Sequence, residues 1–410
     1  MKHPLEGITV LDLSHALAGP YCSTFLADFG AEVIKIEPPG SGEISRSWGF
    51  PLPGGVENEY FTSLHRNKKG MVIDLKSAEG IALLLRMVEK ADVVLENFRP
   101  GTLDRLGLGY ERARQRNAGI IYCSVSGFGQ DGPYRDRAGM DLVVQAESGM
   151  ISVTGELGGR GVRAGVSIAD LTGGMNAALG ILLALRVREK TGLGQSVDVS
   201  MMEGQMSLLS TILGAYLATG EIPGPMGTAY KPILPYQTFR TRSRDLALAV
   251  GTEKLWKDFC PAIGCPGLAD DPRYATNSAR NQNRESLISK LQEVFLSKTY
   301  EEWEDILVAN GIPVGAINNM EELVNHPQVK ARGSLVEVDH PRAGKIRMVG
   351  APVRLSATPG EIRTAAPLLG EHNREVLREM LGLSDDQIEE LRRMGAFGTP
   401  SGAATLSSLQ

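Results

Sequence analysis

Apolar and polar positions in the first half of the chain alternate between strand-like and helix-like segments. Residues 8–14 (ITVLDLS) are apolar and β-branched, and the helical segment that follows has Pro20 in its first turn, where proline is accepted. Further strands are predicted at EVIKIE, GMVIDL, DVVLENF and GIIYCSVSGFG, with a helix at SAEGIALLLRMVEKA. Because strands separated by helices need crossover connections, this order predicts an α/β fold with a doubly wound, largely parallel sheet.

The second half of the chain predicts a smaller domain between two parts of the larger one. A buried helix, a strand at SVDVSMM and a further apolar helix continue the large Rossmann-like domain, which is predicted to span residues 1–220. Proline and glycine at 221–235 indicate a linker. Residues 236–325 are predicted to form a smaller α+β domain, with strands at YQTFRT and LALAVG and helices at ESLISKLQEVFLSK and YEEWEDILVANG. Residues 326–397 are predicted to return to the large domain as strands (329–357) and two C-terminal helices, and the polar tail 398–410 is predicted to be disordered.

Composition narrows the class of protein. The chain has 410 residues, and 43 Lys and Arg against 48 Asp and Glu give a net charge of −5, which provides no general attraction for nucleic acid or anionic lipid. Four cysteines (Cys22, Cys123, Cys260 and Cys265) are too few for a disulfide framework in a chain of this length. No signal-peptide pattern precedes the first strand, and the most apolar stretch, 177–185, is too short to span a bilayer. These features predict a soluble, cytoplasmic protein that binds neither nucleic acid nor membranes.

Several common chemistries lack their motifs. The turn after the first strand, SHALAGP, has no GxGxxG fingerprint, so a nicotinamide cofactor is not expected. The sequence contains no HExxH, no GxSxG and no GxxxxGK[ST]. Carboxylates and main-chain amides are therefore the groups expected to carry out the chemistry. Neither a metal nor a permanently bound cofactor is expected.

One carboxylate, Asp170, lies at the end of a short apolar run, directly before a helix that is apolar around most of its circumference. The residues alone leave two interpretations open. Aspartate is a favoured N-cap, so Asp170 could simply begin the helix. Alternatively, glycines at 173 and 174 could let a ligand approach the backbone, where Asp170 could attack an acyl group and nearby amides could stabilise the oxyanion.

The chain as a whole resembles the class III, or formyl-CoA type, CoA-transferases. The resemblance rests on motifs in order from Leu5 to Phe397: LDLSHALAGPYCSTFLADFGAEVIKIEPPGSGE, HRNKKG, DVVLENFRPG, LDRLGLGY, SVSGFGQDGPY, RAGMDLVVQAESG, VSIADLTGG, KTGLGQSVDVSM and PLLGEHN. It implies that Asp170 is the catalytic carboxylate, and that an acyl-CoA and a small carboxylic acid are the substrates. It also implies an open-ring protomer in an interlocked homodimer.

The resemblance further implies which residues bind CoA. By alignment with the formyl-CoA transferases these are Ala16, Leu17 and Ala18 at the pantetheine, Ile73 and Lys76 at the adenosine, Asn97 and Phe98 at the nucleotide, and Arg105 at a phosphate. The formyl-CoA enzymes have an arginine where this chain has Pro38, and Arg137 is the expected replacement. Lys68, Lys69 and Arg99 are further cations, with weaker support because an isolated lysine or arginine is usually a solvated surface charge.

Related chemistries remain as alternatives: acyl-CoA racemase, formyl-CoA:oxalate or carnitine CoA-transferase, or a CoA-binding subunit without activity. Racemases of this superfamily carry histidine in the segment that here reads RAGMD (137–141). A thioether cannot carry a proton at neutral pH, so Met140, interpreted locally as a core filler, favours transfer over racemisation. Retention of Asp170 argues against an inactive subunit.

The acceptor acid is predicted from the region after Gly220. No counterpart of the glycine-rich loop of the formyl-CoA enzymes occurs between Gly220 and Leu246, which disfavours oxalate. GTAYKPILPYQTF, INNMEEL and HPQV look most like the succinyl-CoA:glutarate and related dicarboxylate transferases. Succinyl-CoA is therefore the predicted donor and a C4–C5 dicarboxylate the predicted acceptor, with its free carboxylate held by one of Arg46, His15, Arg163, Tyr230 and Lys231.

Overall fold

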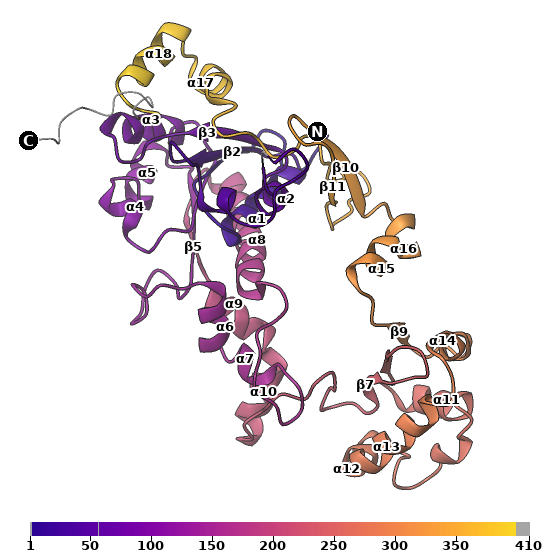
Figure 1. The fold of residues 1–410 in the computed structure, drawn as a ribbon. Coiled ribbons are helices and arrows are strands. Elements are labelled where there is room, and N and C mark those ends of the chain that lie inside the picture. Colours follow the sequence, from indigo (N-terminus) through magenta and orange to yellow (C-terminus); the bar gives the residue numbers. More distant parts are fainter. Residues whose placement is uncertain (1, 56, 399–410) are drawn as a thin grey trace, which may run out of the picture. The chain divides into compact units, whose positions relative to one another are not determined.

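The computed structural model describes residues 2–55 and 57–398, and Figure 1 shows the order of its elements. Contacts divide the chain into two compact units: Met1–Met150, Ala164–Thr219 and Gln328–Gln410 form the first, and Ile151–Arg163 and Gly220–Pro327 form the second. The segment 151–163, placed in the large domain from sequence, thus belongs to the second unit. From residue 399 on, the tail that was predicted to be disordered lies outside the described residues.

A six-stranded, wholly parallel sheet forms the centre of the first unit, which confirms the predicted α/β sheet. Its order is β3–β2–β1–β4–β5–β6, the doubly wound order in which the chain reverses direction of travel between β1 and β4. The strands are β1 (Thr9–Asp12), β2 (Glu32–Glu37), β3 (Lys68–Val72), β4 (Val93–Glu96), β5 (Ile121–Ser126) and β6 (Ser196–Ser200).

Helices bury both faces of this sheet, because successive side chains along a strand point to opposite faces. Val10 and Val33 face one core, which includes residues of α1 (Ala18–Asp28) and α8 (Ile168–Thr191). Their neighbours Leu11 and Ile34 face the other core. Its helical contributions come from α3 (Ala78–Val88), α5 (Tyr110–Arg116), α17 (Asn373–Leu381) and α18 (Asp385–Arg393). The continuous apolar runs of the central strands follow from this burial on both sides.

Helix α8 is longer than the apolar stretch noted in the sequence. Its 24 residues make it the one helix, within 2–55 and 57–398, that is long and apolar enough to cross a membrane by length and composition. About half of its most apolar window is buried inside the chain, where α8 packs on α1 and on the sheet. This packing is typical of a core helix in a globular domain.

The remaining elements of the first unit connect or flank the sheet. A two-stranded antiparallel hairpin joins β10 (Leu335–His340) to β11 (Gly344–Val349), within the range predicted to contain strands. The short elements are η1 (Ile44–Ser47), α2 (Glu59–Leu64), α4 (Thr102–Arg105), α6 (Asp141–Glu147), α9 (Met201–Leu208), α10 (Ser210–Thr219) and α16 (Pro327–Ala331). Helix α7 (Met150–Val153) begins with the last residue of this segment of the first unit and otherwise belongs to the second unit.

The second unit has its own antiparallel sheet and aromatic core. Strands β7 (Tyr236–Phe239), β8 (Leu246–Ala249) and β9 (Val314–Ala316) form the sheet in that order. Trp256, Phe295 and Trp303 are at most 2% exposed in its core. Its helices are α11 (Glu253–Ala262), η2 (Pro266–Leu268), α12 (Asn277–Gln282), α13 (Arg284–Phe295), α14 (Tyr300–Ala309) and α15 (Met320–Asn325). The sequence predicted β7, β8, α13 and α14.

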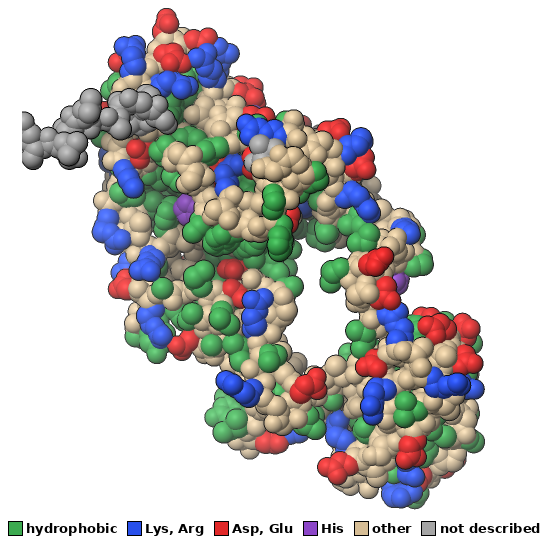
Figure 2. Space-filling model, viewed as in Figure 1, with side chains coloured by type: hydrophobic (Ala, Val, Ile, Leu, Met, Phe, Trp, Pro, Cys, Tyr) green, Lys and Arg blue, Asp and Glu red, His purple; other side chains and the backbone are tan. Residues whose placement is uncertain are grey.

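Surface charge agrees with the near-balanced composition. On the face drawn in Figure 2, Lys and Arg side chains are interspersed with Asp and Glu side chains. An anionic ligand would therefore depend on a local group of cations.

Candidate active site

The loops that follow β1 and β4 meet at the point where the strand order reverses. In open α/β sheets, ligands bind in the crevice at the carboxyl ends of the strands at such a point. Here Asn97 joins the two loops: its Oδ1 accepts the His15 amide at 2.7 Å, and its Nδ2 donates to the His15 carbonyl at 2.8 Å. The predicted residues Ala16, Ala18 and Asn97 therefore lie at this point of the sheet, but the amide of Asn97 is already occupied by the protein backbone.

Phe98 and Glu96 complete the β4 side of this crevice. The ring of Phe98 meets that of His15 edge-on, with 4.8 Å between ring centroids, and its amide donates to Glu96 Oε2 at 2.8 Å. Burial and the negative charges of Asp104 and Asp198 raise the pKa of Glu96 to about 7, against hydrogen bonds from Ser124 and the Phe98 amide. Phe98 is thus held by both its backbone and its ring.

Asp170 lies inside α8, because that helix begins at Ile168 with Ser167 in the N-cap position. The N-cap interpretation of Asp170 is therefore wrong. Its carboxyl is half-buried in the first helical turn, and no hydrogen bond or ion pair within residues 2–55 and 57–398 involves its side chain. A half-buried carboxyl without a protein partner in the first turn of a helix is available for chemistry.

The glycines after Asp170 serve packing between helices. A Cβ on Gly174 would lie 2.5 Å from the Ala18 carbonyl oxygen, and one on Gly173 would lie 3.0 Å from Met201 Cγ. Both glycines stand beyond the first four residues of α8, where amides are bonded within the helix. The expectation that they admit a ligand to the backbone or supply oxyanion amides is therefore corrected: they let α8 pack on α1 and α9.

A second carboxylate stands close to Asp170. Asp141, the first residue of α6, accepts the amide of Ala169 at 2.9 Å through Oδ1. Gln145, fully buried, donates to Asp141 Oδ2 at 2.7 Å and accepts the Ala164 amide at 2.9 Å. Asp141 and Gln145 thus fix the chain on both sides of the residues that lead into α8.

This environment changes the acidity of Asp170. Burial, followed by the negative charge of Asp141, raises the pKa of Asp170 from 3.8 to about 7. A carboxyl with this pKa is about half ionised at neutral pH, and desolvation leaves its ionised form reactive. A perturbed carboxyl of this kind is typical of functional sites.

An aromatic pair that sequence analysis missed lies near the two carboxylates. Burial and the charges of Asp170, Glu43 and Asp141 raise the pKa of Tyr60 to about 12. Trp48 packs edge-on against Tyr60, with ring centroids 5.4 Å apart. Nothing in the sequence around Tyr60 marks it, because its proximity to Asp170 depends on how residues 44–64 fold.

Two arginines form a cationic group at the start of α4. A Cβ on Gly101 would lie 3.4 Å from Arg105 Nη1 and 3.4 Å from Arg135 Nη2, so both guanidinium groups face the same point of the backbone. Arg105 is exposed and donates to Thr102 Oγ1 at 3.1 Å. Paired guanidinium groups suit a phosphate, which supports the expectation for Arg105 and adds Arg135.

The other predicted CoA residues are placed less favourably. Ile73 is 1% exposed within the core that includes α3 and α17, so its side chain cannot flank an adenosine. Lys76 is exposed in the turn before α3. Arg137 forms an ion pair with Glu147 at 3.0 Å and stacks on Tyr134 at 4.1 Å, which leaves its charge partly neutralised. Leu17, half-buried, precedes α1 at its N-cap position.

Several other cations proposed from sequence already have buried or multiple partners. Lys68 is 2% exposed and contacts Asp12 at 3.2 Å, and Lys69 contacts Glu32, Glu375 and Glu379 at 2.6–2.8 Å. Arg46 is bound by Glu37 at 2.6 Å and by Glu57 at 3.3 Å. Burial and Lys35 lower the pKa of His15 to about 4, against Glu43, so this imidazole is neutral at pH 7. None of these side chains offers an unpaired cation for a second carboxylate.

The remaining candidates for the free carboxylate, Arg163, Tyr230 and Lys231, belong to the second unit. Lys231 forms an ion pair with Glu221, and the ring of Tyr230 packs on that of Tyr236 with centroids 5.6 Å apart. A role for any of the three in holding the acid stays a prediction.

Met140 is 66% exposed at the N-cap position of α6, so its interpretation as a core filler is wrong. Its side chain still lacks a titratable proton.

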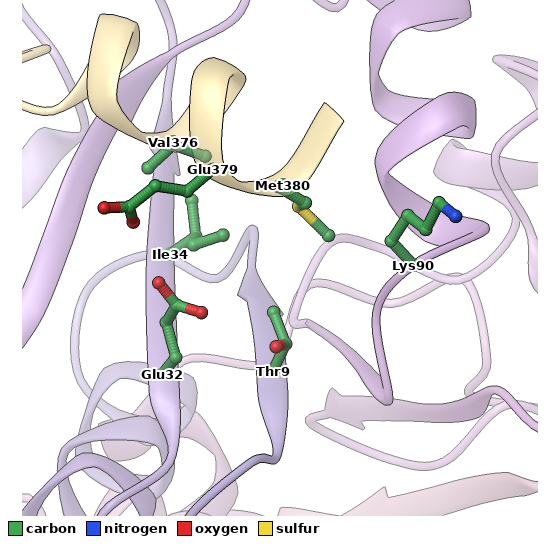
Figure 3. Close-up of a pocket in the computed structure, with 7 residues that line it drawn as sticks. All are labelled: Thr9, Glu32, Ile34, Lys90, Val376, Glu379 and Met380. Carbon is green, nitrogen blue, oxygen red and sulfur yellow. The ribbon is translucent and has the colours of Figure 1, made fainter. Parts of the chain in front are cut away.

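A surface cavity of about 230 Å³ lies away from this crevice. It is lined by Thr9, Glu32, Ile34, Lys90, Val376, Glu379 and Met380 (Figure 3). Thr9 and Glu32 begin β1 and β2, whereas the crevice loops follow the other ends of their strands. The cavity is therefore not part of the site around Asp170.

Comparison with known proteins agrees with this geometry. The family model described as CoA-transferase family III matches residues 5–373. The human protein named succinyl-CoA:glutarate CoA-transferase is 38% identical over 392 residues, which cover 96% of this chain and 89% of that protein. The Acetobacter aceti protein named acetyl-CoA:oxalate CoA-transferase is 39% identical over 381 residues, which cover 92% of this chain and 96% of that protein. A solved CAIB/BAIF family protein from Brucella suis has a TM-score of 0.81 and 35% identity, with 93% of this chain and 100% of that chain covered.

A six-stranded parallel sheet with a half-buried carboxyl, unpaired among the described residues, on the helix that packs against α1, together with this similarity, defines a CoA-transferase. The chain belongs to CoA-transferase family III. Relatives named for different acids are similar to it to the same degree, so the acid that it uses is a separate question.

Proposed function

We propose that this enzyme moves CoA from succinyl-CoA to a C4–C5 dicarboxylate such as glutarate, with Asp170 as its nucleophile. The observation that carries the role of Asp170 is its half-buried carboxyl, without a protein partner among the described residues, in the first turn of α8. The first residue of α1, Ala18, packs one turn further along the same helix against Gly174, so the crevice loop lies beside the nucleophile.

A carboxylate nucleophile conserves the energy of the thioester through each step. Asp170 attacks the thioester carbonyl of the donor, the carbon–sulfur bond breaks, and CoA leaves as a thiolate with a mixed anhydride on Asp170. The thiolate then attacks the aspartyl carbonyl of this anhydride, which releases succinate and gives an aspartyl-CoA thioester. The acceptor carboxylate attacks the aspartyl carbonyl of that thioester, the carbon–sulfur bond breaks, and CoA thiolate leaves a second mixed anhydride between Asp170 and the acceptor. The thiolate then attacks the acceptor carbonyl of this anhydride, which forms the new acyl-CoA and frees the Asp170 carboxylate.

The protein's contribution is position and protection from water. Holding the thiolate beside the anhydride gives a high effective molarity, while exclusion of water prevents hydrolysis of the anhydride. The rigid loops after β1 and β4 fit the first requirement, and the Trp48–Tyr60 pair fits the second as a wall near Asp170.

The dicarboxylate preference rests on sequence similarity to the human succinyl-CoA:glutarate enzyme and on the motifs after Gly220. An exchange assay with succinyl-CoA and a panel of glutarate, malonate, oxalate and carnitine tests it, with each acyl-CoA product separated by chromatography. Glutaryl-CoA as the fastest product supports the proposal. Oxalyl-CoA as the main product would replace glutarate with oxalate, and no product from any of the four acids would remove succinyl-CoA with a C4–C5 dicarboxylate as the substrate pair.

The role of Asp170 has its own test. Asp170→Ala should lose transfer while retaining CoA binding, and hydroxylamine should convert the activated Asp170 carboxyl into a hydroxamate in the unmodified enzyme exposed to succinyl-CoA. Normal turnover by Asp170→Ala would require another nucleophile.

We also propose a homodimer of open-ring protomers that pass through one another. A stripe of apolar side chains on α8, at every fourth residue, is 45–60% exposed: Met175, Leu179, Leu183 and Val187. Such a stripe needs a covering surface, and a second copy of the chain is the proposed partner. An interlocked pair cannot separate without unfolding, so its mass should stay that of a dimer at low nanomolar concentration, and a folded active monomer there would exclude interlocking.

A further inference from the structure

The backbone from Ser14 to Ala16 is held by side chains from several different elements. Every polar backbone group from the Ser14 amide to the Ala16 amide has such a partner. Ser14 N–H donates to Asp12 at 3.0 Å, and Lys35 donates to Ser14 C=O. Asn97 accepts from His15 N–H at 2.7 Å and donates to His15 C=O at 2.8 Å, and Ala16 N–H donates to Glu43 Oε2 at 3.1 Å. This loop lies at the switch point of the sheet.

Ala16 has a conformation that alanine normally avoids. Its φ is +62°, and within 2–55 and 57–398 only Ala16 and Asn67 have positive φ without being glycine. For a residue with a Cβ this left-handed conformation is unfavourable, so it persists only where the surroundings impose it. The partner of the Ala16 amide is Glu43.

Glu43 is a rigid, ionised acceptor. It is 2% exposed, accepts the Ser45 amide at 3.2 Å and the Ser45 hydroxyl, and has His65 Nε2 at 3.3 Å from its Oε1. Lys68 can only donate, so its 3.2 Å bond to His65 Nδ1 places the ring proton on Nε2, facing Glu43. Burial acts to raise the pKa of Glu43, but the His65 N–H that faces it and the charge of Lys35 outweigh burial and hold that pKa well below its usual range.

We propose that Glu43 is a positioning residue that holds Ala16 in its left-handed conformation and so prepares the loop 14–18 to receive the thioester-bearing arm of CoA. The inference rests on the proposed function, because it assumes that this loop receives CoA. Glu43 itself is buried beneath the loop and touches no reacting atom.

Replacing Glu43 by glutamine tests this role with almost no change in size. The amide group that Glu43→Gln introduces removes the negative charge from the acceptor of the Ala16 amide, and it sets an N–H donor against either the His65 Nε2–H or the Ala16 and Ser45 amides, so the bond to Ala16 is weakened in either orientation. Loss of a charged hydrogen bond should weaken CoA binding, measured by calorimetry without an acyl acceptor, by roughly ten- to a hundredfold. KM for the acyl-CoA should rise more than kcat falls, and amide exchange of the peptide that contains residues 13–18 should accelerate.

Ala16→Gly distinguishes positioning from simple loss of structure. Glycine enters the left-handed region without penalty, so Glu43→Gln should cost less CoA affinity when combined with Ala16→Gly than when introduced alone. A difference of at least threefold between the two costs, on the order of 0.65 kcal/mol, supports the proposal. Equal costs with and without Ala16→Gly would show that Glu43 does not act through Ala16.

Asp28→Asn is the matched control. Asp28 is also a buried carboxylate with a cationic partner, Arg66 at 2.6 Å, but it lies at the far end of α1 from the loop. Asp28→Asn should lower thermal stability without changing CoA affinity or exchange of residues 13–18. If Glu43→Gln behaves like Asp28→Asn, the positioning role is excluded.

If Glu43→Gln does not fold, Asn97→Ala is the second variant. Loss of both bonds to His15 should weaken CoA binding by a similar factor, and unchanged CoA affinity would overturn the argument that the loop must be held rigid.

The outcome separates this inference from the proposed function. Absence of CoA binding by the unmodified enzyme would contradict the proposed function. Tight CoA binding that Glu43→Gln leaves unchanged would contradict the positioning role alone.

Discussion

Asp170→Asn should stabilise the protein at neutral and alkaline pH while it abolishes transfer. Burial and Asp141 raise the pKa of Asp170 from 3.8 to about 7, so the folded state favours the protonated form. The stability that the protonated carboxyl provides is fully present below pH 3.8, the ordinary pKa that applies to the unfolded chain. It is lost as the pH rises through about 7, the pKa in the folded state. Asparagine has nearly the same shape and stays neutral, so above pH 7 it avoids the cost of ionising the buried carboxyl.

The size of the effect follows from the shift. A shift of about three pKa units, at 1.36 kcal/mol for each, corresponds to about 4 kcal/mol between low and high pH. In a unit as large as the first, this corresponds to a rise in Tm of up to roughly 8 °C. The difference in Tm between Asp170→Asn and the unmodified protein should therefore be near zero at pH 4 and largest above pH 8.

Differential scanning calorimetry from pH 4 to pH 8.5 at one scan rate measures this difference. Asp131→Asn, which neutralises an exposed carboxylate, is the control and should show no such dependence. A Tm difference that does not vary with pH, or an Asp170→Asn variant less stable than the unmodified protein at pH 8, would show that Asp170 is ionised and paired in the folded state.

Three further predictions concern the same site. Asp141→Asn removes a negative charge beside Asp170, so the acid limb of the kcat/KM profile should move to lower pH. Activity at pH 6 should rise roughly two- to fivefold relative to activity at pH 8. An unmoved limb would show that the charge of Asp141 does not affect the pKa of Asp170. Arg135→Ala should raise KM for acyl-CoA about tenfold with kcat unchanged, as should Arg105→Ala, and a normal KM in both variants would exclude the phosphate role of this pair. A chiral 2-methylacyl-CoA incubated in deuterated water should gain no α-deuterium at a rate that competes with transfer, because Met140 carries no proton; rapid exchange would point to racemisation by other groups.

Sequence patterns were sufficient for the large sheet. Its strands are continuous apolar runs separated by helices. This order predicts a parallel sheet because parallel neighbouring strands need crossover connections. Helix α11 was missed although its buried residues Trp256, Phe259 and Cys260 recur at helical spacing; only Pro261, near its C-terminal end, argues against a helix there. Strand β9 has three residues and too little pattern to predict.

Only the part of the site that belongs to recognisable sequence motifs could be predicted. Resemblance selected Asp170 and the loop around Ala16, but partners across the fold decided which other residues are available. Lys68 was proposed as an accessible cation, and Ile73, in the apolar run GMVIDL, was assigned to CoA by resemblance alone. Both prove to be buried because each lies within or next to a strand covered on both faces. Tyr60 lies in the short helix α2 and Arg135 in a turn, and the sequence around each contains no periodic signal that would place it at the site.

The contact between Gly174 and Ala18 has a consequence for how substitutions in this enzyme would be interpreted. A single methyl group at Gly174 would overlap the Ala18 carbonyl at 2.5 Å and the Cys22 amide at 3.3 Å, so α1 and α8 would have to separate. Asp170 stands one turn from this contact on one helix, and Ala18 begins the other. A displacement of about 1 Å between reacting groups can cost a hundredfold in rate. In a mutational scan scored by activity, substitutions at Gly174 would therefore lower activity as strongly as substitutions at Asp170. Only a comparison of protein abundance with turnover would show that Gly174 acts as the spacer between Asp170 and the loop before α1.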